Sequence, residues 1–170
     1  NVFTSAFSDF FCNFGGGGST LGLVLMMTFI AKSKRLKTLG RMALPAGIFG
    51  INEPIIFGFP MVLNVIMVIP FILAPVMNTI IGQLATAVGF IPVTSGVQLS
   101  WTTPIFISGY LTTGSINAVI LQLFMLLADM ALYYPFFKMQ DSKYLEEEEK
   151  LAKEEKKDEI DELSFDDLKL

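Results

Sequence analysis

Long apolar runs, separated by short polar or glycine-rich breaks, make up most of this sequence. Between Met42 and Phe137 the only charged residues are Glu53 and Asp129. A surface that faces water cannot be built from such a segment, because nearly every exposed side chain would be hydrocarbon. The pattern predicts an all-α polytopic membrane protein, since helices satisfy their own backbone hydrogen bonds in lipid.

Three apolar stretches approach the ~20 residues that a helix needs to cross a bilayer. Residues 14–31 reach about 18 residues when the glycines are included. Residues 60–90 contain Pro60, Pro70 and Pro75, and we expect either a tilted, kinked span or a span plus an interfacial piece there. Residues 116–137 form the clearest span. Residues 1–13 are aromatic and apolar, and we expect the end of a preceding membrane segment or an interfacial helix there.

Two further apolar stretches are interrupted near their middles. Asn52-Glu53-Pro54 interrupts residues 42–60, and Trp101-Thr102-Thr103-Pro104 interrupts residues 97–113. Each half of the first stretch rises only ~12–15 Å as a helix, which reaches about the bilayer midplane. We therefore predict two re-entrant helical hairpins, broken at these two motifs. For the first stretch, one spanning helix kinked at Pro54 is the alternative.

Charge is concentrated in two places. Residues 32–41 carry five basic side chains and no acid, and the segment from Lys138 onward is strongly acidic. A short basic loop beside a membrane segment marks the cytoplasmic side. We expect residues 1–137 to be membrane-embedded and residues 138–170 to form a charged cytoplasmic tail, helical to about residue 160. The acidic balance argues against a nucleic acid partner.

The two proline-containing breaks are the best candidates for a solute site. Paired, interrupted membrane helices expose backbone groups and helix ends at mid-membrane, where transporters bind their substrates. Glu53 has no basic neighbour in sequence, and its carboxylate can accept hydrogen bonds from hydroxyl groups. Asn52 stands beside it. Trp101 can stack on a sugar ring or lie at the membrane interface, and Thr102 and Thr103 offer further hydrogen bonds.

The glycine run, the single cysteine, the lack of histidine and Asp129 restrict the kinds of binding site that the chain can form. The run Gly15–Gly18 lacks the Lys-Ser/Thr of a phosphate-binding loop, so the backbone of Gly16 and Gly17 is expected beside the solute or at a close helix contact. The chain has no histidine and a single cysteine, Cys12, and we expect neither a metal nor a cofactor. Asp129 either pairs within the helix bundle or faces a water-filled cavity.

Three motifs together resemble one known family. They are Asn13–Leu21 (NFGGGGSTL), Gly50–Gly58 (GINEPIIFG) and Trp101–Pro104 (WTTP). These residues resemble the C-terminal half of the IIC permeases of the bacterial phosphotransferase system for lactose, cellobiose and chitobiose. The resemblance covers about residues 1–140, and its specific part is the Asn-Glu-Pro block. The family usually has fewer consecutive glycines at this position.

The resemblance implies a dimeric, multi-pass protein of the bacterial plasma membrane that translocates a disaccharide. It implies that Glu53 bonds the sugar near its 6-hydroxyl, orienting it or accepting its proton, and that Trp101 stacks on a ring. The phosphoryl donor would be a separate, phosphorylated IIB protein. A family histidine upstream of these motifs has no counterpart here, and Asn1 is not an initiator, so we expect a fragment of a longer polypeptide.

Other functions are compatible with the residues alone. An unrelated secondary transporter or channel could use Glu53 as an ion or solute ligand. A truncated fragment could have no activity by itself. A polytopic membrane enzyme with Glu53 as its base lacks a recognisable second catalytic group.

Overall fold

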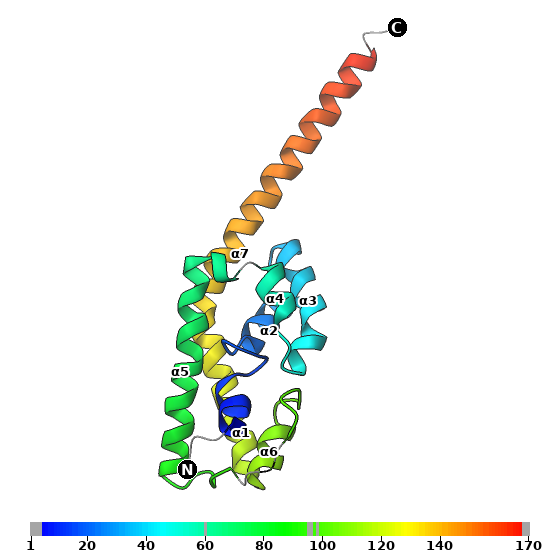
Figure 1. Cartoon of the computed structure of the whole chain (residues 1–170). Helices are drawn as coiled ribbons and strands as arrows, with labels where there is room; N and C mark the ends of the chain where they lie inside the picture. Colours follow the sequence, from blue (N-terminus) through cyan, green and yellow to red (C-terminus); the bar gives the residue numbers. More distant parts are fainter. Residues whose placement is uncertain (1–4, 60, 95–96, 98, 168–170) are drawn as a thin grey trace.

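The structure, a computed structural model, describes residues 5–59, 61–94, 97 and 99–167. Within these ranges every regular element is helical, which confirms the predicted all-α class. Two long helices, α5 (Val65–Ala87) and α7 (Ile116–Asp167), pack side by side. Shorter elements lie against them, and α7 extends far beyond the rest of the molecule (Figure 1).

Both long helices are apolar enough to span a membrane. In the most apolar part of α5 only 28% of the residues are buried, and in that of α7 only 39%. The core helix of a soluble protein would be mostly buried, so these exposed apolar faces suit contact with lipid. Pro70 and Pro75 lie inside α5 and Pro135 lies inside α7, as membrane helices tolerate.

The first expected span is not one helix. Residues 14–31 divide into a glycine-containing loop and α2 (Leu21–Phe29), whose nine residues rise only about 13.5 Å. The expectation of a single crossing there was therefore wrong. The cause lies in Gly15, Gly16 and Gly18, which take positive φ angles of 71°, 95° and 83° and turn the chain away from a helical path.

The basic segment is helical rather than a loop. Helix α3 (Lys34–Ile48) begins directly after a short turn and packs closely on α2. Ser33 caps this helix, because its side chain accepts a hydrogen bond from Leu36 N at 3.3 Å. Four of the five basic residues between 32 and 41 therefore lie on α3.

The chain reverses at the first predicted break. Helix α3 ends at Ile48, the turn passes through Gly50 with a φ of 80°, and α4 (Glu53–Gly58) then packs back on α3. A helix–turn–helix pair therefore surrounds the predicted break, with its tip at residues 49–52, but its first helix begins at Lys34 rather than near Met42. Its re-entrant placement in a membrane remains a prediction.

The second predicted break is organised differently. Between Val88 and Phe106 the described residues contain no helix, and α6 (Ile107–Thr113) alone follows the break. The prediction of two half-helices at residues 97–113 was wrong for its first half; Gln98 lies outside the described residues. The remaining elements are α1 (Ser5–Phe7), the π-helix η1 (Ser8–Cys12) and the 3-10 turn η2 (Met61–Leu63).

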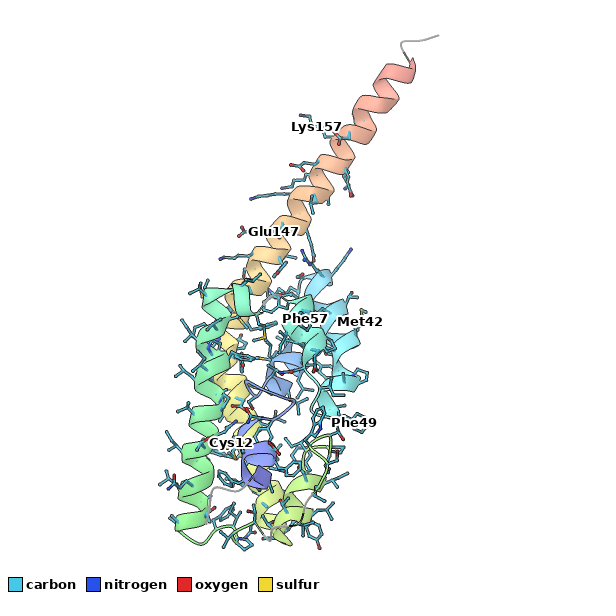
Figure 2. The ribbon with its side chains drawn as sticks, viewed as in Figure 1. Cys12, Met42, Phe49, Phe57, Glu147 and Lys157 are labelled. Atoms are coloured by element: carbon cyan, nitrogen blue, oxygen red, sulfur yellow. The ribbon has the colours of Figure 1, made fainter. Side chains whose placement is uncertain are left out.

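Two apolar clusters hold the molecule together. One joins α2, α3 and α4 to α5 and α7 through side chains such as Met27, Ile55 and Tyr133. The other joins η1 to α5 and α7, and its aromatic centre includes the stacked rings of Phe7 and Phe11. Side chains on the outer surface of α3 and α4, such as Met42 and Phe57, remain exposed (Figure 2).

Candidate functional site

A loop between η1 and α2 forms one side of the candidate site. Hydrogen bonds from Gly16 N to Asn13 O (3.2 Å) and from Ser19 N to Gly16 O (3.1 Å) close two successive turns. Leu21 N then donates to Phe14 O at 3.0 Å. We call residues 15–19 the glycine loop. Only glycine fits at Gly16, because a Cβ there would lie 2.6 Å from Asn52 Cγ.

The turn between α3 and α4 forms the facing side. Asn52 is almost fully buried, and its Nδ2 donates to Gly17 O at 2.7 Å, joining this turn to the glycine loop. Asn52 precedes α4 but makes no side-chain capping bond to it. Glu53 follows as the first residue of α4, and its side chain is exposed.

A pocket of about 350 Å³ opens between these segments. This volume lies at the lower end of the range of small-molecule sites. Five of the seven predicted site residues line it, together with three that the prediction did not include. The full lining is Asp9, Asn13, Gly16, Gly17, Gly50, Asn52, Glu53 and Trp101.

Trp101 closes the pocket from the irregular segment before α6. Its side chain is 59% exposed, and its backbone lies against Gly50, where a Cβ would come within 3.1 Å of Trp101 O. Thr103 lines a smaller neighbouring cavity of about 20 Å³, shared with Trp101 and Asp9. Thr102 lines neither cavity; its hydroxyl contacts Ser100 Oγ at 2.8 Å.

Asp9 and Asn13 are lining residues that sequence reasoning did not assign. They lie four residues apart, in and just after the π-helix η1, and Asn13 Nδ2 donates to Ser8 O at 3.2 Å. π-helical turns often occur at functional sites because they redirect side chains. The signal in the sequence was Asp9, the only charge in an aromatic stretch.

The charge of the pocket restricts its ligands. Two carboxyl groups, Asp9 and Glu53, line it, and no basic side chain does. Such a pocket repels anions and suits neutral ligands with hydroxyl donors. Among the described residues, no group of three or more His, Cys, Asp or Glu side chains could hold a metal ion. Cys12 is buried outside the pocket, with its Sγ 3.2 Å from Thr79 Oγ1.

Asp129 lies behind the glycine loop and does not line the pocket. It is fully buried, and its carboxylate accepts hydrogen bonds from Ser19 Oγ and Asn78 Nδ2. Of the two alternatives that the sequence left open, pairing within the bundle is the one observed.

Comparisons with known proteins identify relatives of this chain. The family model "Phosphotransferase system, EIIC" matches residues 1–75. The cellobiose-specific EIIC component of Geobacillus stearothermophilus is 49% identical over 150 residues, which are 88% of this chain and 33% of that protein. The lactose-specific EIICB component of Staphylococcus aureus (strain N315) is 42% identical over 149 residues, 87% of this chain and 26% of that protein.

A solved structure shares the fold. The transporter ChbC, the IIC component from the N,N'-diacetylchitobiose-specific phosphotransferase system, is 43% identical and superposes with a TM-score of 0.86. The match covers 88% of this chain and 35% of ChbC. The chain therefore spans between about a quarter and a third of the length of these relatives. The predicted resemblance to the EIIC components of the phosphotransferase system is confirmed.

Proposed function

We propose that the permease of which this chain is part binds a disaccharide of the cellobiose, lactose or chitobiose class and carries it across the bacterial plasma membrane. The observation that carries this proposal is the pocket between Asn52-Glu53, the glycine loop and Trp101. It offers an aromatic face, carboxylate and amide groups and no basic side chain. Relatives named for cellobiose, lactose and chitobiose support the sugar class.

Each lining group has a proposed role in binding. The Glu53 carboxylate accepts hydrogen bonds from sugar hydroxyls, and Asn52 holds the glycine loop beside it. The backbone of Gly16 and Gly17 approaches the ring closely, because neither residue carries a side chain. The Trp101 indole packs on the apolar face of a pyranose ring. Thr102 and Thr103 remain predicted hydrogen-bonding groups on the Trp101 side.

The bound sugar is then phosphorylated by a IIB partner. Its 6-hydroxyl oxygen attacks the phosphoryl group on phosphorylated IIB, so that a new P–O bond forms while the bond from phosphorus to IIB breaks. Glu53 orients this hydroxyl or accepts its proton. The phosphoryl carrier lies on IIB, and this chain supplies positioning.

Two contacts at one end of the molecule support a proposed membrane arrangement. The basic turn before α3 lies against the start of the acidic segment, since Lys32 N and Ser33 N donate to Asp141 at 3.0–3.1 Å. Basic residues mark the cytoplasmic side, so we place the C-terminal segment, residues 138–170, in the cytoplasm. The assembly of the whole protein as a homodimer is proposed from the family resemblance.

Replacing Glu53 by Gln tests the proposed function. In the full-length permease, E53Q is expected to abolish sugar uptake and IIB-dependent phosphorylation while leaving the amount of protein in the membrane unchanged. The matched control is Glu147→Gln, which removes an equal charge from the exposed part of α7 (Figure 2). Normal uptake by E53Q, or transport that needs no phosphoryl donor, would overturn the proposal.

A further inference from the structure

The glycine loop is held on the side that faces away from the pocket. Ser19 is fully buried and has a φ of 53°, a conformation that residues other than glycine rarely adopt. Its hydroxyl donates to Asp129 Oδ2 on α7. One residue earlier, Gly18 O accepts a hydrogen bond of 2.6 Å from the buried Tyr133 hydroxyl, also on α7. Two consecutive loop residues are thus bound by one helix.

Helix α5 completes this network. Asn78 is fully buried, and its Nδ2 lies 3.1 Å and 2.9 Å from the two carboxylate oxygens of Asp129 and 3.1 Å from Ser19 Oγ. The partners of Asp129 are thus an amide and a hydroxyl. A buried carboxylate without a basic partner is costly unless such donors surround it, and one of these donors belongs to the loop.

The front of the same loop lines the pocket. Gly16 and Gly17 contribute to the pocket wall, and Gly17 O accepts the 2.7 Å bond from Asn52, the neighbour of Glu53. A continuous chain of contacts therefore runs from Asp129 through Ser19 and the loop to Asn52. Asp129 and Tyr133 touch no part of the pocket, so they can act on a ligand only through the loop.

We infer that Asp129, together with Asn78 and Tyr133, positions the glycine loop for sugar binding. This inference rests on the proposed function and extends it to residues behind the pocket wall. The carboxylate keeps Ser19 in its left-handed conformation, which sets the path of the preceding glycines. The backbone of Gly16 and Gly17 then meets the sugar at the required distance. Asp129 is a positioning residue and takes no part in phosphoryl transfer.

Two variants and one reciprocal exchange test this inference in the full-length permease. D129N places an amide opposite the Asn78 amide. Two NH₂ donors then face each other where a carboxylate oxygen of Asp129 accepts a hydrogen bond in the original protein. The Kd for the sugar, measured by titration calorimetry on purified protein, is expected to rise at least tenfold. The double variant N78D/D129N restores one carboxylate and one amide, and its Kd should return to within threefold of the original.

Y133F is a milder test, because it removes one hydroxyl and keeps the buried ring. It is expected to raise the Kd several-fold. Its matched control is Tyr134→Phe on the same helix turn, where the ring is 45% exposed and the Kd should not change. The thermal midpoint of each variant is measured alongside its Kd, since a purely structural role would lower the midpoint and leave the affinity of folded protein unaltered.

The outcomes separate this inference from the proposed function. An unchanged Kd in both D129N and Y133F, or an exchange variant that binds no better than D129N, overturns the positioning role. If D129N does not fold, Y133F against Tyr134→Phe decides alone. Loss of binding in E53Q with normal binding in both D129N and Y133F removes only the inference, whereas normal binding in E53Q removes the proposed function itself.

Discussion

Trp101 is largely exposed, and it borders the pocket that Glu53 also lines. An indole at a lipid interface would need no such neighbours. Its position beside two carboxyl groups suits a ring that covers a sugar while polar groups take the hydroxyls.

Trp101→Ala is expected to weaken sugar binding at least tenfold, or about 1.4 kcal/mol at 25 °C. Trp101→Phe keeps an aromatic face and should lose less. The measurement is the Kd of the purified full-length permease for its sugar. Equal affinity in the alanine variant and the unmodified protein would return Trp101 to a role at the membrane interface.

Alanine substitutions at the adjacent residues Gly17 and Gly18 should differ strongly in their effect on the stability of the fold. A Cβ at Gly18 would lie 2.2 Å from the Phe71 ring, on a backbone with a φ of 83°, whereas a Cβ at Gly17 would meet nothing within 4 Å. Gly18→Ala should therefore destabilise the fold by more than about 1 kcal/mol, and Gly17→Ala by much less. Thermal unfolding of the two purified variants checks this, and equal midpoints would contradict it.

Helix α3 is held at both ends, so its contact with α7 is connected to the pocket through the helix. At its start, Glu148 on α7 accepts hydrogen bonds from Ser33 Oγ (2.6 Å), Arg35 N (2.8 Å) and Lys34 N (3.1 Å). A carboxylate suits the positive end of a helix. At its other end, α3 leads into the turn with Gly50 and Asn52. The Tyr144 ring supports the same contact, with the Arg35 guanidinium 4.9 Å from its centre.

The pH dependence of this contact follows from the Glu148 carboxyl. Partial desolvation raises its pKa, but the hydrogen bonds from Ser33, Arg35 and Lys34 outweigh this and lower the pKa below its ordinary value. A lowered folded-state pKa stabilises the folded state above the ordinary value near 4.5, and this stabilisation is lost as the pH falls through the lowered pKa.

Glu148→Gln should therefore remove part of the loss of stability on acidification below pH 4.5. It should also weaken the amide-exchange protection of Lys34 and Arg35 at neutral pH. The neighbouring Glu147→Gln makes no such contact and serves as the control. Hydrogen exchange of the full-length protein measures both effects; identical protection in the two variants would rule out the contact.

At the scale of helices and turns, the sequence predicted some elements correctly and misplaced others, for identifiable reasons. The turn at Asn52 was predictable, because the polar residues and Pro54 interrupt an apolar run. The early loop was misjudged, since hydropathy counts glycines as part of a span while their positive φ angles end the helix. Asp9 and Asn13 escaped notice because a π-helical turn leaves no periodic signature. The Asp129 network escaped because its partners are 51 and 110 residues distant.

At the scale of the whole molecule, apolar side chains cover much of the outer surface of α5 and the first half of α7, while the second half of α7 is charged. The boundary between the apolar and the charged half lies near Lys138, and the predicted membrane-embedded part ends at the residue before it. No helix end marks this boundary, because α7 continues through it. Part of the charged half still belongs to the packed body, since Gln140 and Asp141 are nearly buried.

Two truncations separate the packed and the projecting parts of the charged half. A permease that is truncated after Glu149 and otherwise complete keeps Asp141 and Glu148, and it should bind sugar normally. One that stops after Phe137 loses both contacts to the turn before α3, and it should accumulate less in the membrane and unfold at lower temperature. Membrane yield and thermal midpoint measure the difference, and indistinguishable values would show that the contacts contribute little.

Because α7 continues unbroken from Asp129 to Glu148, the two ends of this stretch are parts of one rod, about 28 Å long. Probes attached to the exposed, charged end of this stretch can therefore report tilting or rotation near the glycine loop without being placed beside the pocket. Spectroscopy on such probes offers a way to follow the transport cycle while every residue of the pocket stays native.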